Sequence, residues 1–433
     1  MNSWEKIYAE RKMTAAEAVR KVKSGERIIV GHAAGATDVL LQALVDNCQD
    51  LKDVEVVHMM TLGTAPEVDP KAEGHIRLNA TFVGGNTRKA LAERRADFTP
   101  VFFYEFPEML HKGKPLQADV AFIQVSKPNK DGYCSFGVSC DYTKPAAELA
   151  HTVIAEVNER MPYIAGGDNL IHVSKLDAVV EIDNPVFTLP EAQLTDTDKA
   201  IGGYCAELVK DGATLQLGIG SIPDAVLLSL TGKKDLGIHT EMFSDGVVEL
   251  VRKGVINGSK KTLHKGKLVA TFLMGTQKLY DFAAECPDVE MYPVNYVNDP
   301  RVVMKNDNMV SINSCIEVDI MGQVNSETIG LKQFSGTGGQ VDYVRGTAMS
   351  KGGLSIMAMP STAAKGKVSR IVPFLGEGAA VTTGRTDVNY VVTEYGIASL
   401  KGATLKQRAE RLINIAHPDF RPMLKEEYNK RFK

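Results

Sequence analysis

Residues 25–41 read GERIIVGHAAGATDVLL and residues 212–228 read GATLQLGIGSIPDAVLL, so the same pattern occurs twice in the chain. In each segment a glycine precedes a short apolar run, a second glycine, a loop of small residues, and an aspartate that opens an apolar helix. A strand, a glycine-rich turn and a helix in this order form one βα unit of a parallel sheet. Two more pairs of segments correspond in the same order, 53–63 with 235–246 and 131–135 with 321–326. Any one pair would also fit unrelated strand–turn–helix segments, but three pairs in order favour a duplicated α/β fold.

The predicted elements alternate along the chain. Apolar runs of strand length occur at 27–30, 54–57, 118–125 and 178–182, and apolar residues with helical spacing occur at 15–22 and 39–45. Residues 184–197 hold two prolines and little periodicity, so we expect a linker there and domains at 1–187 and 188–433. Thr404 and Gln407 form a capping-box pattern ahead of a last amphipathic segment that Pro418 ends. The predicted fold class is therefore two related open α/β domains, with mostly parallel sheets and helices on both faces.

The composition excludes several classes of protein. The chain has 433 residues, with 50 Lys and Arg against 53 Asp and Glu and a net charge of −3, so a broad basic surface for nucleic acid is not expected. No apolar run reaches the ~18 residues of a membrane span, and the first twelve residues have charges spread among them and no apolar stretch, so we expect a cytoplasmic protein with no membrane partner. Six cysteines show no C-x-x-C pair and no zinc-ligand spacing, so we expect no metal site.

A glycine-rich turn follows the strand predicted at 215–217. Residues 216–223 read QLGIGSIP, ahead of a helix that we expect to begin near Asp224. Backbone N–H groups at such a turn suit an anionic or carbonyl oxygen. The G-x-G-x-x-G pattern of dinucleotide-binding proteins fails because Pro223 occupies the third glycine position. A dinucleotide enzyme stays an alternative, since Glu241 lies 21 residues beyond Gly220, and so does a tight turn without a ligand.

A second glycine cluster lies at 334–342, which reads FSGTGGQVD. Three glycines within four residues are costly in backbone entropy unless another group must approach the main chain closely. The neighbouring sequence lacks the Gly/Ser repeats of a flexible linker. We interpret this segment as a loop whose backbone faces a ligand, with a structural turn as the alternative.

Glu241 is a candidate catalytic residue. It lies in HTEMFSDG (239–246), after an apolar stretch and before a turn, at the expected carboxyl end of a parallel strand where ligands bind in α/β sheets. It could act as a general base, a metal ligand or a nucleophile, or it could be a solvated loop carboxylate. A serine hydrolase has no support because no G-x-S-x-G motif occurs.

Small polar residues gather in three other segments, at 295–300, 311–316 and 322–327. Asparagine amides both donate and accept hydrogen bonds, which suits a carbonyl or amide of an elongated ligand, although turn formation explains them equally well. The basic stretch at 260–267 could meet phosphates, but a solvated surface loop is the simpler interpretation.

Six motifs resemble, in order, those of the acetyl-CoA hydrolase/transferase family of class I CoA-transferases. They are QLGIGSIPDAV (216–226), LGIHTEMFSDGVV (236–248), SINSCIEVDIMGQVNSE (311–327), FSGTGGQVDYVRG (334–346), SRIVPFLGEGAAVTTGR (369–385) and VVTEYGIA (391–398). Within this family the sequence is most similar to members that use 4-hydroxybutyrate, and next to members that use butyryl-CoA and acetate.

The resemblance implies two α/β domains of related fold and a set of site residues. Glu241 matches the catalytic nucleophile, and Gly338, Gly339 and Asn298 are implied to act with it. Glu394 also matches a position near the reacting centre. The residues implied to bind CoA, besides the two glycines, are Gln216, Leu217, Gly218, Ile219, Gly220, Asn313 and Ile316.

The activity implied by the resemblance is transfer of CoA from acetyl-CoA, or a similar short acyl-CoA, to 4-hydroxybutyrate by a ping-pong mechanism through a glutamyl-CoA thioester. Coenzyme A is then a substrate, no tightly bound cofactor is expected, and the partners are acyl-CoA, short carboxylic acids and a second copy of the chain in a homodimer. Alternatives are transfer between butyryl-CoA and acetate, acyl-CoA hydrolysis, a non-catalytic acyl-CoA sensor and an NAD-binding oxidoreductase.

Overall fold

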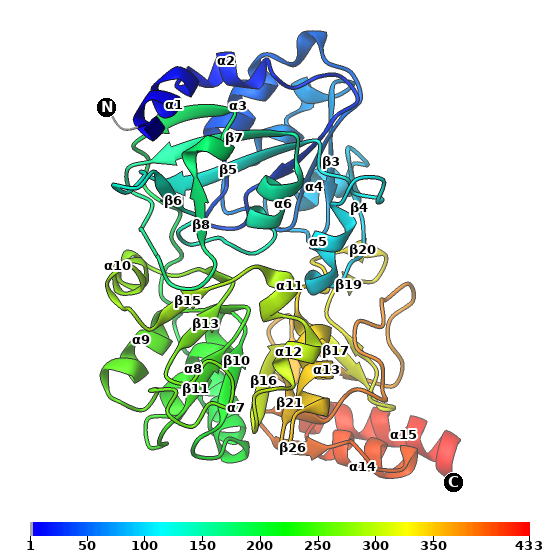
Figure 1. Ribbon diagram of the computed structural model, residues 1–433. Helices are drawn as coiled ribbons and strands as arrows, with labels where there is room; N and C mark the ends of the chain where they lie inside the picture. Colours follow the sequence, from blue (N-terminus) through cyan, green and yellow to red (C-terminus); the bar gives the residue numbers. More distant parts are fainter. Residues whose placement is uncertain (1–2) are drawn as a thin grey trace. The chain divides into compact units, whose positions relative to one another are not determined.

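Residues 3–433 of the chain, described by a computed structural model, form two compact units (Figure 1). Unit 1 extends to Pro190 and includes Val269–Val297. Unit 2 comprises Glu191–Leu268 and Asn298–Lys433. The segment that returns to unit 1 is attached by backbone hydrogen bonds, for example from Cys140 N to Thr271 O at 3.1 Å and from Met291 N to Gly166 O at 3.0 Å. The domain boundary expected at 187/188 stays a prediction, because each unit consists of two separate segments of the chain.

Unit 1 is built on a parallel sheet of seven strands in the order β4-β3-β2-β1-β5-β7-β9. Register pairs Ile29 with Val57 on one side and with Ala121 on the other. All seven residues of the central strand β5 are buried, as both faces of an all-parallel sheet are covered. The strand bounds are β1 Arg27–Val30, β2 Val54–His58, β3 Ile76–Ala80, β4 Ala96–Phe98, β5 Val120–Ser126, β7 Thr152–Asn158 and β9 Ala178–Ile182.

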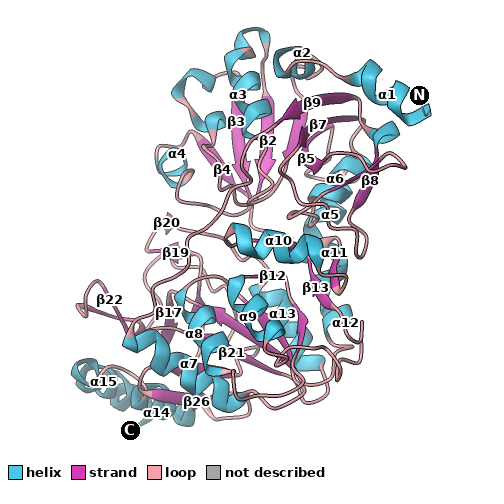
Figure 2. Cartoon of the chain, turned by 90° about the vertical axis from the view of Figure 1, so that its left-hand side faces the viewer, coloured by secondary structure: helices cyan, strands magenta, loops and turns pink. Residues whose placement is uncertain are grey.

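Helices, one hairpin and the returning segment complete unit 1 (Figure 2). The hairpin joins β6 (Tyr133–Ser135) to β8 (Leu170–His172). The helices are α1 Ser3–Arg11, α2 Ala15–Val19, α3 Asp38–Asp46, α4 Arg88–Ala92, α5 Phe106–Met109, α6 Thr143–Leu149, α10 Gln277–Glu285 and α11 Val294–Val297. Short 3₁₀ turns are η1 Cys48–Asp50, η2 Pro66–Val68, η3 Pro70–Ala72, η4 Phe103–Glu105 and η5 Val173–Lys175, and the short strands of this region are β13 Leu268–Ala270, β14 Phe272–Leu273 and β15 Val289–Met291.

Unit 2 repeats the plan. Its first strand, β10, pairs in parallel with β11 on one side and β16 on the other, and β21 and β25 continue the sheet beyond β16. Strand β26 ends this side as an antiparallel edge. The bounds are β10 Thr214–Leu217, β11 Gly237–His239, β12 Met242–Phe243, β16 Met309–Ser314, β21 Leu354–Ala358, β25 Tyr390–Thr393 and β26 Gly396–Ser399. Small sheets contain β17 Glu317–Asp319, β18 Val324–Asn325 and β24 Ile371–Val372, then β19 Thr328–Ile329 with β20 Lys332–Gln333, and β22 Thr362–Ala363 with β23 Val368–Ser369.

Three helices of unit 2 begin after a residue whose side chain accepts a hydrogen bond from the first helical turn. Thr404 and Gln407 form the predicted capping box at the start of α14. Helix α8, however, begins at Ser221 and not near Asp224, because proline is tolerated in the first helical turn. The helices are α7 Asp196–Leu208, α8 Ser221–Ser229, α9 Asp245–Arg252, α12 Pro300–Val303, α13 Gln340–Met349, α14 Leu405–Asn414 and α15 Arg421–Phe432, with the 3₁₀ turn η6 at Pro418–Phe420. None of the helices among residues 3–433 has the length and apolar character needed to cross a membrane.

The expected α/β class is confirmed, and the two units share their strand order. In each, the first strand lies between the next strand and a much later one, β1 between β2 and β5, and β10 between β11 and β16. The order therefore reverses beside the first strand, and ligands of open α/β sheets bind at the carboxyl ends of strands at this switch point. Each unit thus offers one place for a site.

A buried carboxyl group supports the first helix after β1. Glu156 on β7 is 1% exposed and accepts a hydrogen bond from Leu40 N of α3 at 2.8 Å. Burial raises the pKa of Glu156 from 4.5 to about 8, against the lowering effect of the backbone hydrogen bonds. Between these two values the folded protein binds a proton that the unfolded chain has released, so this group makes the fold less stable as the pH rises.

We predict that Glu156→Gln, which keeps an acceptor for α3 without the ionisable proton, reduces the pH dependence of stability. Between pH 5 and pH 8 the free energy of unfolding should fall by about 3 kcal/mol more in the wild type than in the variant. Urea unfolding at both pH values measures this difference. Parallel pH profiles for the two proteins would contradict the assignment.

Candidate functional site

Glu241 lies at a reversal of the chain at the carboxyl end of β11. The chain leaves β11 at His239 and returns as β12, which pairs antiparallel with β10 through Leu217 and Met242. The hydroxyl of Thr240 accepts from Leu217 N at 3.2 Å and donates to Met242 O at 2.8 Å, which fixes the turn. Glu241, the next residue, is therefore held beside the end of β10. No motif in the sequence points to Thr240.

The backbone of the glycine turn after β10 is open. A Cβ on Gly218 would meet no atom closer than 3.9 Å, and one on Gly220 would meet nothing within 4 Å. Gly220 has a φ of 112°, which residues other than glycine rarely adopt, and it is the N-cap of the nine-residue helix α8. Ile219 between them is 44% exposed. An approaching ligand can therefore reach the main chain at this turn.

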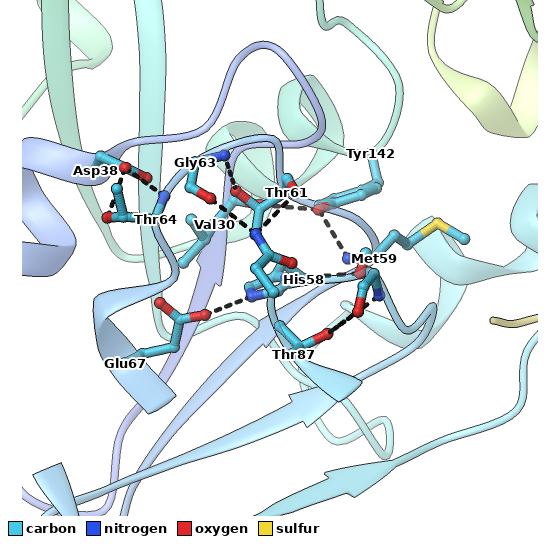
Figure 3. A network of polar contacts seen from close by, with 12 residues as sticks. Val30, Asp38, His58, Met59, Thr61, Gly63, Thr64, Glu67, Thr87 and Tyr142 are labelled. Carbon is cyan, nitrogen blue, oxygen red and sulfur yellow. Dashed lines mark hydrogen bonds and ion pairs between the residues drawn. The ribbon is translucent and has the colours of Figure 1, made fainter. Parts of the chain in front are cut away.

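The corresponding turn of unit 1 is closed by the protein itself. A Cβ on Gly31 would overlap the carbonyl group of Gly35, and one on Gly35 would overlap the Ser139 side chain. Figure 3 shows the loop after β2 fastened beside the end of β1, where the Tyr142 hydroxyl donates to Val30 O at 2.9 Å and accepts from Met59 N at 3.2 Å. Of the two switch points, that of unit 2 has the open main chain.

Further contacts in Figure 3 fasten the loop after β2. His58 Nε2 and Glu67 Oε1, both buried, are joined by a hydrogen bond of 2.8 Å, and Asp38 accepts from Thr64 N at 2.6 Å. The aspartate that opens the helix of this βα unit is therefore used to hold a loop.

Unit 1 also contains a cavity of about 390 Å³ beside β2 and β3. Its basic side chains are engaged by the protein, since Arg77 pairs with Asp97 and Arg95 pairs with Glu93. Acidic side chains form much of the remaining wall. This cavity does not suit an anionic ligand, and we do not assign the site to it.

Three of the residues expected to act in catalysis come together in unit 2. The Asn298 amide donates from Nδ2 to Glu241 Oε2 at 2.7 Å. Gly339 lies so close to this pair that a Cβ there would overlap both Glu241 Oε2 and Asn298 Nδ2. Gly339 is the N-cap of the ten-residue helix α13, whose positive end therefore faces the Glu241 carboxylate. Gly338, beside it, has φ of 53°, and both glycines are buried.

Two residues of α13 that were not among the predicted site residues also contact Asn298. The Tyr343 hydroxyl donates to Asn298 Oδ1 at 3.3 Å, and Asp342 Oδ2 lies 3.4 Å from Asn298 Nδ2. Burial raises the pKa of Tyr343 well above its usual value, and the nearby charges of Glu241 and Asp342 raise it further.

The residues expected to bind CoA lie in three places. Gln216 and Asn313 join their side-chain amides across β10 and β16 by two hydrogen bonds of 3.2 and 3.1 Å, and both are at least nine-tenths buried. This pair links β10 to β16 next to the open turn formed by Gly218 to Gly220. Ile316 lies outside it, between β16 and β17, where its backbone binds Asn325 O and the Arg370 side chain.

Two other sequence candidates have structural partners. Glu394 accepts from Ser361 N at 2.8 Å and from Ser361 Oγ at 2.6 Å, which ties the segment after β25 to the one after β21. In the basic stretch, Lys261 is 3% exposed and donates to Ile238 O at 2.7 Å, so the expectation of a solvated surface loop is wrong for this residue.

Among the described residues, no group of three or more His, Cys, Asp and Glu side chains could hold a metal ion.

Comparisons with known proteins cover both units. The acetyl-CoA hydrolase/transferase N-terminal domain matches residues 1–190, and the acetyl-CoA hydrolase/transferase C-terminal domain matches residues 275–428. The chain is 60% identical to the 4-hydroxybutyrate coenzyme A transferase of Clostridium kluyveri, over 99% of this chain and 100% of that protein. It is 45% identical to the succinyl-CoA:cyclohexane-1-carboxylate CoA transferase of Geobacter metallireducens, over 98% of this chain and 96% of that protein.

A solved structure gives the same result. The crystal structure of 4-hydroxybutyrate CoA-transferase from Porphyromonas gingivalis superposes with a TM-score of 0.86 and 50% identity, and covers 99% of this chain and 100% of that one. The chain is therefore a CoA-transferase and belongs to the acetyl-CoA hydrolase/transferase family.

Proposed function

We propose that this protein transfers CoA from acetyl-CoA, or a similar short acyl-CoA, to 4-hydroxybutyrate, with Glu241 as a nucleophile that carries CoA between the two acids. The acceptor is inferred from the names of similar proteins in Clostridium kluyveri and Porphyromonas gingivalis. The observation that carries the nucleophile is the contact of Glu241 Oε2 with the Asn298 amide and the Gly339 backbone at the start of α13.

The reaction itself favours a carboxylate nucleophile. A serine would form an ordinary ester, which lies well below a thioester in free energy and would trap the acyl group, whereas an acyl-glutamyl anhydride keeps that energy. Attack of Glu241 on the donor thioester forms the anhydride and expels CoA thiolate. The thiolate then attacks the glutamyl carbonyl, forming enzyme-bound CoA thioester and releasing the first acid. The acceptor acid repeats both steps in reverse order and leaves as its CoA thioester.

Each group near Glu241 has a role in these steps. We assign the attack to Oε1, because Oε2 is held by the Asn298 amide. When the thiolate later attacks the glutamyl carbonyl, negative charge develops on that oxygen, and the same amide N–H can stabilise it. The Gly338 and Gly339 N–H groups are our candidates for stabilising the oxyanion of the donor thioester, since both lie at the positive end of α13. Gly218 and Gly220 supply main chain that the thioester can approach.

The acid used by this chain is the finer part of the proposal. A related enzyme is named for succinyl-CoA and cyclohexane-1-carboxylate, so the acid differs among relatives. Butyryl-CoA:acetate transfer and hydrolysis are the competing activities. A homodimer, a cytoplasmic location and the absence of a tightly bound cofactor stay expectations of the proposal.

We predict that wild-type enzyme incubated with acetyl-CoA and no acceptor acid carries CoA covalently on the peptide that contains Glu241. Glu241→Gln should lose this adduct and lower the rate of transfer on the order of 10⁴-fold or more, because the nucleophile is gone. Mass spectrometry of the digested protein detects the adduct. Initial rates measure transfer, and the double-reciprocal lines of the wild type should be parallel.

The matched control is Glu207→Gln, an exposed glutamate on α7, which should keep both the adduct and the rate. An adduct on another residue, or intact transfer in Glu241→Gln, would overturn the assignment of the nucleophile.

A second prediction concerns the space at Gly339. Its φ of −92° is open to alanine, so Gly339→Ala should fold, but the new Cβ must displace the Glu241 carboxylate or the Asn298 amide. A displacement of about 1 Å in a catalytic group typically costs ~100-fold in rate, and we expect a loss of this order in kcat. Gly203→Ala in α7 is the control, since its Cβ would meet nothing within 4 Å. Equal kcat values for the two variants would contradict the proposed site.

The acceptor is tested with a panel of acids. With acetyl-CoA as donor, the specificity constant should be highest for 4-hydroxybutyrate, and butyrate, which lacks only the hydroxyl group, should be at least about tenfold poorer. Labelled acetate and water complete the panel. A higher value for butyrate would favour the butyrate-specific alternative, and faster release of CoA to water than to any acid would favour hydrolysis.

A further inference from the structure

The amide of Asn298 lies in a fully buried setting with different partners at its two ends. Its Nδ2 faces two carboxylates, Glu241 Oε2 at 2.7 Å and Asp342 Oδ2 at 3.4 Å. Its Oδ1 faces the hydroxyl group of Tyr343 at 3.3 Å. Asn298 and Tyr343 are 0% exposed, and Asp342 is 1% exposed.

An asparagine side chain can rotate by half a turn about its last bond with little change in shape. Rotation would exchange the donor and the acceptor of Asn298, so that an oxygen would face Glu241 and the reaction would lose the N–H group at that point. Because Tyr343 presents an O–H to Oδ1, the observed orientation satisfies both ends of the amide. The rotated orientation would place oxygen against two carboxylates.

We infer that Tyr343 is a positioning residue, whose hydroxyl group fixes the amide of Asn298 so that Nδ2 and not Oδ1 faces the nucleophile. This inference deepens the proposed function and rests on Glu241 being the nucleophile. Nothing in the sequence motifs or in the comparisons assigns a role to Tyr343.

The fold holds Tyr343 in a place suited to this role. Gly339, Asp342 and Tyr343 occupy positions i, i+3 and i+4 at the start of α13, so they share one face of the helix. The Tyr343 ring packs in a small cluster with Val303 and Met309, which fixes the direction of its hydroxyl group. The first turn of α13 thus contains both the Gly339 backbone, which lies close to Glu241, and the Tyr343 hydroxyl group, which orients Asn298.

The ionisation of Tyr343 is consistent with a donor. Burial is the largest cause that raises its pKa, and the charges of Glu241 and Asp342 act in the same direction. The phenol therefore keeps its proton throughout the neutral range and can donate it to Oδ1.

Tyr343→Phe tests the inference, since phenylalanine retains the ring and its packing and removes only the hydroxyl group. We expect kcat to fall about tenfold, the value of one hydrogen bond of ordinary strength, with little change in KM for acetyl-CoA. Thermal unfolding, measured on each variant, should show a folded protein. Tyr280→Phe is the matched control: Tyr280 is also fully buried, and its hydroxyl donates to Phe187 O in unit 1 at 2.7 Å. Its kcat should equal that of the wild type.

The deciding measurement is a double-mutant cycle with Asn298→Ala. If Tyr343 acts through Asn298, the hydroxyl group has no effect on kcat once the amide is absent, and Asn298→Ala with and without Tyr343→Phe should give the same rate. An unchanged kcat in the single Tyr343→Phe variant, or an equal loss in both backgrounds, would overturn the inference. Absence of the Glu241 adduct in the wild type would instead mean that the proposed function itself fails.

Discussion

The Glu241 carboxylate lies against the backbone of Gly339 without room for a methyl group between them, and the geometry of the site follows from this contact. It requires glycine at the N-cap of α13, and it requires a chain reversal after β11 that presents Glu241 to that helix. Thr240 holds the reversal, and Asn298 occupies the remaining side of the carboxylate. A negative charge at the positive end of a helix is stabilised where it lies, so the helix holds the Glu241 carboxylate, our proposed nucleophile, in place.

The two units show how one βα plan can either pack its glycine turn or leave it open. Both place a glycine turn after their first strand at the switch point of a parallel sheet. In unit 1 the turn is packed by Gly35 and Ser139, whereas in unit 2 the positions of Gly218 and Gly220 are open. Strand order alone therefore identifies two possible sites. The space around individual glycines distinguishes the open turn of unit 2 from the packed turn of unit 1.

Much of the fold could be predicted because its signals are local. The apolar runs at 27–30 and 178–182 are β1 and β9, and the cap at Thr404 depends on a residue only three positions away. The proposed role of Glu241 rests on the family resemblance, since spacing alone is equally compatible with a solvated loop carboxylate. Tyr343 and Thr240 were missed because their value lies in contacts across 45 and 23 positions of the chain, which no local pattern encodes. The return of Val269–Val297 to unit 1 was missed for the same reason.

The central claim is that an oxygen atom of Glu241 takes part in each transfer, and isotope transfer from the acceptor acid tests it most directly. When an acceptor labelled with oxygen-18 in its carboxylate attacks the glutamyl-CoA thioester, one labelled oxygen bridges the anhydride and remains on the enzyme after the thiolate attacks the acceptor carbonyl. We predict that the peptide containing Glu241 gains oxygen-18 during turnover with acetyl-CoA and labelled 4-hydroxybutyrate. Label found in the released acetate, with none in that peptide, would mean direct reaction between the two substrates and would contradict the account.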